Sequence, residues 1–596
     1  MKLSDYVVQF LVDKGIRNMF LVSGGGIMHM LDSVGRNPEI TYYCNSHEQA
    51  CAVSAEGHAR VTGKPGVCLA TVGPGSSNAL SGILSAWTDS IPLIVLVGQV
   101  RQDLIADYTK LRQFGPQEAN TIDMARPVTK YAVSIRDPKR VRYEMERAWH
   151  EATSGRPGPV WVEFPLDVQG ANVDESELIG FDIPPPPDSA KVAGQVRDVI
   201  AALRAAKRPI FIAGNGIRLA GALGSLHAIL DRSHIPVVMP FAAKDLVADA
   251  SPHNLGVFGT AGQRRANFAV QNSDCVISLG AGLNCQKVGF NFKGFAPNAK
   301  KIIVEIDEHQ LFDQAIKPDV AVHCDVGLFL AEFLRQTEHD SLRPADRWLQ
   351  ACANWKQRYP LITSDYFDNP ECVNSYVFMD KLSDALKPDD TIVAGAGLDV
   401  VSWYQAFRSK SGQRSFSSAW GSMGWDLPMT IGACVGARKR RTICVTGDGS
   451  IQWNIQELLT ISRYRLPIKI FIFNNLGYAS IRATQNSFFE GRYVGADHAS
   501  GLANPDFMKI AEAYGLGYSR IANNAALGAG LAAALADDQP AICEVNLAKD
   551  QGISPKASAF RRPDGTFESR PLEDMSPFLP REEVHENMHL FDEEGA

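Results

Sequence analysis

Nine short apolar runs, rich in β-branched and aromatic residues, constrain the fold of this chain more than any other feature. They are separated by segments with helical spacing, and nearly all end in Gly, Asp or Asn: GVCLATVG, IPLIVLVG, GPVWVEFP, RPIFIAGNG, DCVISLGAG, KKIIVEID, DTIVAGAG, RTICVTGDG and IKIFIFNN. Strands that are buried on both faces and alternate with helices form parallel α/β sheets, and ligands of such sheets bind at the carboxyl ends of the strands. We therefore look for functional residues at the ends of these runs.

The chain of 596 residues is too long for one core and predicts roughly three to four units of about 150 residues. Two segments resemble linkers: the proline run Pro184–Pro187 and the polar stretch Glu338–Arg347. They predict three domains, at 1–180, 190–337 and 350–550. The segment 551–596 has little periodicity and is expected to be an extended tail or lid, because it carries many charges and five prolines: Pro555, Pro563, Pro571, Pro577 and Pro580.

The composition argues against several classes of partner. Hydrophobic residues make up 45% and charged residues 21%, and the net charge is -7, without a dense basic stripe; we expect no nucleic-acid partner. The longest apolar stretches, such as residues 91–98, are shorter than the roughly 20 residues that cross a bilayer, so we expect no membrane partner. The N-terminus lacks the apolar region of a signal peptide, and the eleven cysteines form no CxxC pair and suit reduced core positions. We expect a cytoplasmic protein.

Two neighbouring strand ends carry oxygen ligands for a hard cation. The run RTICVTGDG places Asp448 at the end of a strand, and a helical segment follows. After the 24 residues 450–473, which end in the strand IKIFIF, the chain continues Asn474-Asn475-Leu476-Gly477. The Asp448 carboxylate, the Asn475 amide oxygen and the Gly477 carbonyl would give Mg²⁺ three ligands, and a diphosphate with one water would complete an octahedron. Either motif alone is ordinary turn chemistry.

Together, at this spacing, the two motifs resemble the metal and diphosphate signature of thiamine-diphosphate enzymes. Gly447 and Gly449 would let the backbone approach the phosphates, and the helix that begins after Ser450 would present N–H groups to them.

A segment near the N-terminus carries the second half of the resemblance. ITYYCNSHEQACAVSAEGHARVTGKPGVCLATVGPGSSNAL resembles the pyrimidine-binding segment of the acetolactate synthase family. Glu48 matches the glutamate that bonds to the aminopyrimidine of the cofactor and activates it, which a protein must supply. Gly73-Pro74-Gly75 and Asn78 match the turn that lines the pyrimidine pocket. An isolated glutamate would ordinarily be a solvated helix residue; the neighbouring strand and turn favour the functional interpretation.

The resemblance covers roughly 550 residues and keeps the order of the family's motifs. Gly421-Ser422-Met423-Gly424-Trp425 is similar to the segment whose methionine supports the bent cofactor, although Met423 alone would also suit a core. The family implies three Rossmann-like, doubly wound parallel-sheet domains (pyrimidine-binding, central and diphosphate-binding) of class α/β, and a homodimer or homotetramer with active sites at the subunit interface. Further cofactor contacts implied by the resemblance are Gly25, Gly397, Leu398, Asp399, Ser422, Tyr478 and Ile481.

The middle domain resembles the part of acetolactate synthases that binds FAD. Gly259, Gly262, Glu305, Asp307 and Asp325 fall where the family contacts a nucleotide. However, Leu283-Asn284-Cys285-Gln286 replaces the family's Arg-Phe-Asp-Asp stretch, and relatives with the same fold bind ADP or nothing. FAD, ADP and no nucleotide all remain open.

The residues around the expected substrate predict carboligation. Gln117 matches a glutamine that the synthases place beside the reacting group. The family's acceptor-sensing phenylalanine is Pro116 here, and its downstream tryptophan falls near Thr484, which predicts a roomier acceptor pocket. The resemblance then implies transfer of an acyl unit from a 2-oxoacid, pyruvate, to a ketone acceptor such as a nucleotide-bound 4-keto sugar, as in enzymes that make yersiniose-type branched sugars. Acetolactate synthase, a simple 2-oxoacid decarboxylase, and a thiamine- or nucleotide-binding sensor are the alternatives.

Overall fold

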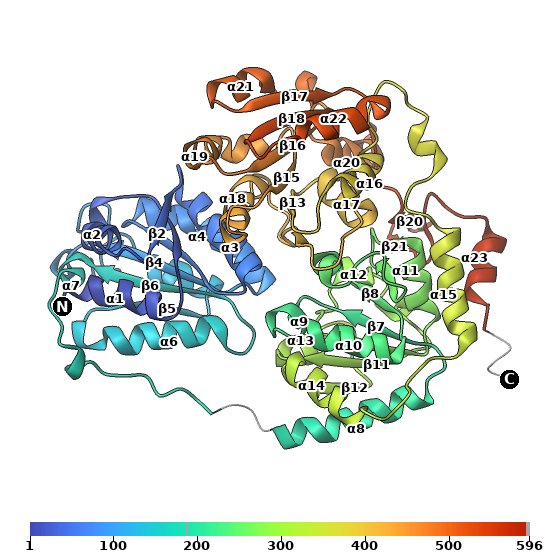
Figure 1. Ribbon diagram of the computed structural model, residues 1–596, viewed down its shortest axis with the longest axis horizontal. Coiled ribbons are helices and arrows are strands. Elements are labelled where there is room, and N and C mark those ends of the chain that lie inside the picture. The colour runs from blue at the N-terminus through green and yellow to red at the C-terminus, as the bar shows by residue number, and fades with distance from the viewer. Residues whose placement is uncertain (186–188, 592–596) are drawn as a thin grey trace.

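Three parallel β-sheets follow one another along the chain, and helices cover both faces of each sheet (Figure 1). The computed structural model describes residues 1–185 and 189–591. Each sheet contains six strands, all of them parallel. The predicted α/β class with three doubly wound sheets is confirmed. Residues 186 and 187 of the predicted proline linker lie outside the described part of the chain.

The first sheet has the order β2-β1-β3-β4-β6-β5, with the strand that ends at Ala70 near its centre. Its strands are β1 (Asn18–Leu21), β2 (Thr41–Cys44), β3 (Gly66–Ala70), β4 (Leu93–Gln99), β5 (Tyr131–Ser134) and β6 (Pro159–Pro165). Its helices are α1 (Leu3–Asp13), α2 (Met28–Arg36), α3 (Glu48–Thr62), α4 (Pro74–Asp89), α5 (Thr121–Ala125), α6 (Val141–Thr153) and α7 (Leu166–Gln169).

The second sheet has the order β12-β11-β10-β7-β8-β9, so the strand order reverses between β7 and β10. Its strands are β7 (Pro209–Ala213), β8 (Val237–Met239), β9 (Asn254–Val257), β10 (Cys275–Leu279), β11 (Lys300–Glu305) and β12 (Val320–His323). The helices of this part are α8 (Ser189–Ala205), α9 (Gly216–Leu219), α10 (Leu223–Ser233), α11 (Arg264–Asn272), α12 (Cys285–Val288), α13 (Glu308–Phe312), α14 (Val326–Gln336) and α15 (Asp346–Arg358).

The third sheet has the order β14-β13-β15-β16-β18-β17, and its two central strands are β15 and β16. Its strands are β13 (Thr391–Ala394), β14 (Ser415–Phe416), β15 (Thr442–Gly447), β16 (Ile468–Asn474), β17 (Gly517–Ile521) and β18 (Ala541–Asn546). Its helices are α16 (Ser375–Ala385), α17 (Leu398–Ala406), α18 (Asp426–Gly436), α19 (Glu457–Tyr464), α20 (Ala479–Phe489), α21 (Phe507–Ala513) and α22 (Leu527–Ala534).

Every one of the nine apolar runs forms a strand, because each is buried on both faces. β3, β4, β6, β7, β10 and β13 are buried along their whole length, as expected of central strands covered by helices on both sides. The edge strands β5, β12 and β17 are only partly buried and carry a weaker apolar pattern.

The first and third sheets meet through α3 and α18, which lie side by side in Figure 1. The two helices touch backbone to backbone. A Cβ on Gly57 would lie 2.1 Å from the Met429 carbonyl oxygen, and one on Gly432 would lie 1.8 Å from that of Ser54. Glycine is required at both positions, and the contact fixes the start of α3 relative to the third sheet.

The segment after Lys549 contains secondary structure that its composition does not indicate. Short strands pair as β19 (Lys556–Ala557) with β22 (Met575–Ser576) and β20 (Ala559–Arg561) with β21 (Phe567–Ser569), and the helix α23 (Arg581–Met588) follows. The segment packs on the middle unit, beside α15 in Figure 1. The Asn267 side-chain amide donates to the Leu572 carbonyl at 3.0 Å, and the Trp355 indole donates to Asn587 Oδ1 at 2.8 Å. These long-range contacts order the segment.

Among the helices of residues 1–185 and 189–591, none combines the length and the apolar character that a membrane span needs.

Candidate active site

Asp448 lies immediately after the central strand β15, with its side chain 2% exposed. Its Oδ2 accepts hydrogen bonds from the Gly477 backbone N–H at 3.0 Å and from the Asn504 side-chain amide at 2.7 Å. Burial raises the pKa of this carboxyl, and these donors oppose the rise. Parallel strands β15 and β16 pair side by side, so the loops at their carboxyl ends meet.

Asn475, one residue past β16, presents an oxygen that has no partner. Its side chain is 6% exposed, and its Oδ1 is buried without a hydrogen bond in the part of the chain that the structure describes. A buried amide oxygen without a donor is costly, and a cation would satisfy it. Among the described residues, no three His, Cys, Asp or Glu side chains cluster as a metal site. Asp448 and Asn475 therefore fit a cation that takes its other ligands from the backbone and a bound phosphate, as Mg²⁺ does.

Arg482 holds the loop that carries Asn475, and the sequence did not single it out. It lies on α20, and its side chain is 1% exposed. Its guanidinium donates to the carbonyls of Asn475 at 3.0 Å, Ala496 at 3.2 Å and Leu476 at 3.4 Å, and also to that of Lys549. Leu476 has φ 61° and Gly477 has φ 127°, so the clamp maintains a backbone turn that few residues adopt.

The Gly-Asp-Gly turn is covered by two side chains that the sequence placed in the cofactor site. A Cβ on Gly449 would lie 2.2 Å from Cε1 of Tyr478 and 3.4 Å from Cε of Met423. Only glycine fits beneath these side chains. By contrast, a Cβ on Gly447 would meet nothing within 4 Å, so the backbone there stays open to a ligand.

Ser450 and Ser422, two further residues predicted to contact the cofactor, lie in neighbouring loops. The Ser450 hydroxyl is already used, because it donates to Asp426 Oδ2 at 2.8 Å and accepts from the Gly424 N–H at 2.9 Å. The Ser422 hydroxyl donates to the Met423 carbonyl at 3.2 Å. Both hydroxyls therefore fix the loops around Met423.

Gly397, Leu398 and Asp399 lie at the N-terminus of α17, after β13. The Asp399 side chain is 2% exposed and accepts from the Gly397 N–H at 2.6 Å. Its carboxyl is therefore buried inside the protein.

Glu48 begins α3 in the first sheet, and its carboxyl is held from two sides. The Asn78 side-chain amide donates to its Oε2 at 3.0 Å. A Cβ on Gly75 would lie 3.0 Å from Oε1, so the turn after Pro74 closes over the carboxyl. Glu48 is 9% exposed. The predicted Gly-Pro-Gly turn and glutamate thus lie against each other, although Glu48 and Pro74 are 26 residues apart in the sequence.

Gln117 lies in a strained loop directly over this turn. It has φ 62°, and a Cβ on Gly73 would lie 1.7 Å from the Gln117 carbonyl oxygen. Glu118 anchors the loop by accepting from the Phe114 N–H at 2.6 Å and the Tyr108 hydroxyl at 2.5 Å. A non-glycine residue with positive φ is held this way only when its surroundings impose it, and such positions cluster at functional sites. The side chain of Gln117 is exposed.

Gly25 lines the same sheet edge. The loop after β1 rests on Thr71, whose hydroxyl accepts from the Gly26 N–H at 3.2 Å. A Cβ on Gly25 would meet nothing within 4 Å, so its backbone faces open space.

Hydrogen bonds link the region around Glu48 to the region around Asp448 in the same chain; we call these two regions the half-sites. The Asn454 side-chain amide donates to Gln49 Oε1 at 3.2 Å, and Glu457 accepts from Asn45 and from the Ser46 N–H, both at 2.8 Å. Across residues 1–185 and 189–591, no hydrogen bond or ion pair joins Glu48 to Asp448 directly. Glu48 with Asn78, and Asp448 with Asn475, are therefore two separately built groups.

Ile481 and Thr484 lie on α20, beyond the Asn475 loop. Ile481 is 43% exposed, and the Thr484 hydroxyl donates to the Ser480 carbonyl at 3.0 Å. The same helix ends in the exposed Phe488 and Phe489.

The acidic residues predicted for a nucleotide in the middle domain have structural partners. Asp307 caps α13 and pairs with Arg156 at 2.9 Å, and Asp325 caps α14. Glu305 accepts from the Ile306 N–H at 3.0 Å. Gly259 donates its N–H to Asn267 at 2.9 Å, and Gly262 packs against Gly259. Capping accounts for these aspartates without a ligand, so FAD stays a prediction.

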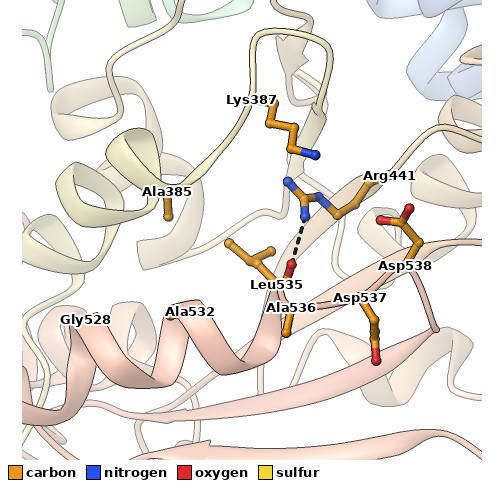
Figure 2. Close-up of a pocket in the computed structure, with 9 residues that line it drawn as sticks. All are labelled: Ala385, Lys387, Arg441, Gly528, Ala532, Leu535, Ala536, Asp537 and Asp538. Carbon is orange, nitrogen blue, oxygen red and sulfur yellow. Dashed lines mark hydrogen bonds between the residues drawn. The ribbon is translucent and has the colours of Figure 1, made fainter.

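A cavity of about 440 Å³ lies elsewhere (Figure 2). It is lined by residues of α22 and by Arg441, whose guanidinium donates to the Leu535 carbonyl at 3.0 Å. Arg441 directly precedes β15, while Asp448 follows it. The cavity therefore lies at the amino-terminal ends of the strands, whereas the candidate site lies at their carboxyl ends.

Comparison with known proteins gives three family matches along the chain. Residues 1–124 match the N-terminal TPP binding domain of thiamine pyrophosphate enzymes, residues 196–333 their central domain, and residues 396–545 their C-terminal TPP binding domain. Among similar proteins, the acetolactate synthase isozyme 1 large subunit of Escherichia coli (strain K12) is 30% identical over 560 residues, which cover 93% of this chain and 95% of that protein. The acetolactate synthase large subunit of Parasynechococcus marenigrum is 32% identical over 559 residues, covering 91% and 86%.

Proposed function

Because the chain belongs to the acetolactate synthase-like family of thiamine-diphosphate-dependent enzymes, we propose that it is a carboligase. It removes CO₂ from a 2-oxoacid, pyruvate, and transfers the remaining acyl unit to a ketone or 2-oxoacid acceptor. The observation that carries the proposal is the unsatisfied Asn475 Oδ1 beside the buried Asp448, at the carboxyl ends of adjacent parallel strands. Thiamine diphosphate, when bound, supplies a carbon nucleophile for the 2-oxoacid carbonyl.

We propose that Asp448, Asn475 and the Gly477 carbonyl bind Mg²⁺, which in turn holds the diphosphate. The open backbone at Gly447 supports this role, because anions bind where N–H groups are accessible. The other proposed cofactor contacts are Gly25, Glu48, Pro74, Asn78, Gly397, Leu398, Asp399 (through its backbone), Ser422, Met423, Gly449, Ser450, Tyr478 and Ile481.

Glu48 is the proposed proton partner of the aminopyrimidine. Its Oε2 is fixed by Asn78, so a proton on the carboxyl has a defined direction. Gln117 is the second proposed catalytic residue. Its strained loop over the Gly73 turn supports a role beside the 2-oxoacid.

The acceptor is proposed to be larger than pyruvate. Pro116 and Thr484 stand where the family has aromatic side chains, and this difference supports a roomier acceptor site. We propose a nucleotide-bound 4-keto sugar as an acceptor of this kind. Acetolactate synthase is the second candidate, because the similar proteins bear that name.

The resemblance to the acetolactate synthase family supports a proposal for the assembly. We propose a homodimer or homotetramer in which Glu48 of one chain meets Asp448 of another, with domains at 1–180, 190–337 and 350–550, a C-terminal segment at 551–596, and a cytoplasmic location. FAD in the middle domain remains a proposal that visible absorbance of the purified protein tests.

The test is product analysis with purified protein, Mg²⁺ and thiamine diphosphate. Pyruvate is supplied alone and with a panel of ketones that includes nucleotide-bound 4-keto sugars. Carboligation predicts a product that contains the ketone and two carbons of pyruvate. Release of acetaldehyde alone would identify a decarboxylase, and an unchanged pyruvate pool would refute the proposed function.

A further inference from the structure

Two buried carboxyls meet behind the loops of the candidate cofactor site. Asp399 lies in the first turn of α17, Asp426 begins α18, and each side chain is 2% exposed. A Cβ on Gly395 would lie 2.1 Å from Asp399 Oδ2 and 2.7 Å from Asp426 Oδ2. The two oxygens therefore converge on one point, which only a glycine leaves free.

The two carboxyls have different partners. Asp426 Oδ2 accepts from the hydroxyls of Thr446 at 2.5 Å and Ser450 at 2.8 Å, and its Oδ1 accepts from the Leu427 N–H at 2.9 Å. These donors suit an ionised carboxylate. Asp399 Oδ1 accepts from the Gly397 N–H, but its Oδ2 is buried and has no partner among the described residues. Two like charges this close in the interior do not both ionise, so one oxygen keeps a proton, and Asp399 Oδ2 is the atom with room for it.

Asp426 joins the two segments that would enclose the cofactor. Thr446 and Ser450 flank the Gly447-Asp448-Gly449 turn, and both donate to Asp426. Ser450 also accepts from the Gly424 N–H, next to Met423. One carboxylate thus sets the spacing between the Asp448 turn and the Met423 segment.

We propose that Asp426, ionised beside a protonated Asp399, is the positioning residue that holds the Asp448 turn against the Met423 segment. The neutral Asp399 keeps a second negative charge away from the diphosphate. The inference rests on the proposed function only for the identity of the bound anion; the carboxyl pair itself does not depend on it.

The surroundings of the pair favour this charge state. Burial, and next the charge of Asp426, raise the pKa of Asp399 to about 7, and burial raises the pKa of Asp426. On β15, burial and both carboxyls raise the pKa of the Cys444 thiol, which stays neutral.

Other titratable groups on the packed helices have partners of their own. Glu56 on α3 pairs with Arg60, and Asp380 and Asp384 on α16 pair with Arg408. Glu457 on α19 accepts from Asn45 and Ser46. Asp426 is therefore the charged group that acts on Asp399 directly.

Binding of the cofactor should weaken as the pH rises. The pKa of Asp399 is raised in the folded protein, so the stabilising neutral form is lost as the pH rises through about 7. Above that pH the two carboxylates repel, and the loop at α17 carries a charge that opposes the diphosphate. If the bound diphosphate raises the pKa of Asp399 by one unit, the affinity for the cofactor should be about tenfold lower well above pH 7 than well below it.

Infrared spectroscopy of the cofactor-free protein tests the pair. A protonated carboxyl gives a C=O stretching band that a carboxylate lacks. We expect such a band in the wild type below pH 7, its loss as the pH rises, and its absence in Asp399→Asn. Asp389→Asn, which changes an exposed carboxyl of the same domain, is the control and should retain the band. A wild-type band that Asp399→Asn does not remove would overturn the assignment.

Calorimetric titration with thiamine diphosphate and Mg²⁺ tests the coupling. In Asp399→Asn the amide is neutral at every pH and donates to Asp426. We therefore expect this variant to bind thiamine diphosphate as tightly at every pH as the wild type does at low pH. Asp426→Asn should weaken binding at all pH values. Identical pH profiles for wild type and Asp399→Asn would contradict the inference. If neither protein binds thiamine diphosphate at any pH, the proposed function fails, and the infrared band still decides whether the pair exists.

Discussion

The side-chain amide of Asn78 donates to Oε2 of Glu48 at 3.0 Å, and the two residues lie near the starts of neighbouring helices, α4 and α3. Both helices start at the carboxyl ends of parallel strands of one sheet. The carboxyl is thus oriented by a side chain of the neighbouring helix in the same domain.

The first prediction concerns this carboxyl. Glu48→Gln keeps the size of the side chain but removes the proton-exchanging group, so kcat should fall by about 100- to 10,000-fold. Binding of thiamine diphosphate should change little, because Asp448 and Asn475 are untouched. Steady-state kinetics and calorimetric titration measure the two effects. Undiminished turnover would remove Glu48 from the mechanism, and Glu39→Gln, at an exposed position of the same domain, controls for loss of charge.

The second prediction concerns the turn beneath Tyr478. Gly449→Ala places a methyl group 2.2 Å from the Tyr478 ring and displaces it, which should weaken cofactor binding by about 1–3 kcal/mol. Adding Tyr478→Ala removes the clash, so the double variant should bind more tightly than the single one. Gly528→Ala, which meets nothing within 4 Å on the far edge of the sheet, is the control. Equal affinity of wild type and Gly449→Ala would contradict the packing described.

The third prediction concerns the clamp on the metal loop. Arg482→Met leaves several buried carbonyls without a donor, including those of Asn475 and Ala496, so the free energy of unfolding should fall by about 1–3 kcal/mol. Mg²⁺ should also bind more weakly, because Asn475 loses its fixed position. Denaturation and metal titration test these effects against Arg492→Met, an exposed arginine just beyond the same helix. An unaltered Mg²⁺ affinity would show that Arg482 does not position Asn475.

The fourth prediction concerns the acceptor. Thr484→Trp restores a large aromatic side chain on α20 and should lower kcat/KM for bulky ketones by at least about tenfold, while pyruvate as acceptor is affected less. Ser487→Trp, on an exposed turn of the same helix, is the matched control. If both acceptors respond equally to Thr484→Trp, this position does not select the acceptor.

Local sequence patterns were sufficient to predict the sheets and the positions of Asp448 and Asn475 at strand ends. The nine apolar runs form buried strands, and the predicted ligands Asp448 and Asn475 follow two of them, because strand ends and turn residues are local features. Only the resemblance to the acetolactate synthase family could place Glu48 beside Asn78, because local sequence patterns do not show which helices will contact each other.

Other features depend on contacts between distant segments. Arg482 is an unremarkable arginine in a helical pattern, and only the folded loop gives it carbonyl partners. Asp399 and Asp426 become a pair only because α17 and α18 both begin near Gly395. The helix α23 is ordered by contacts such as that of Asn587 with Trp355, which composition does not reveal.

The proposed reaction joins an acyl unit from pyruvate to a ketone acceptor. Its most direct test is mass spectrometry of products formed from isotopically labelled pyruvate and an unlabelled ketone, with Mg²⁺ and thiamine diphosphate. We predict a product that contains the ketone and two labelled carbons, that requires thiamine diphosphate, and that Glu48→Gln does not form. Acetolactate as the sole labelled product, at the same rate with and without the ketone, would contradict it.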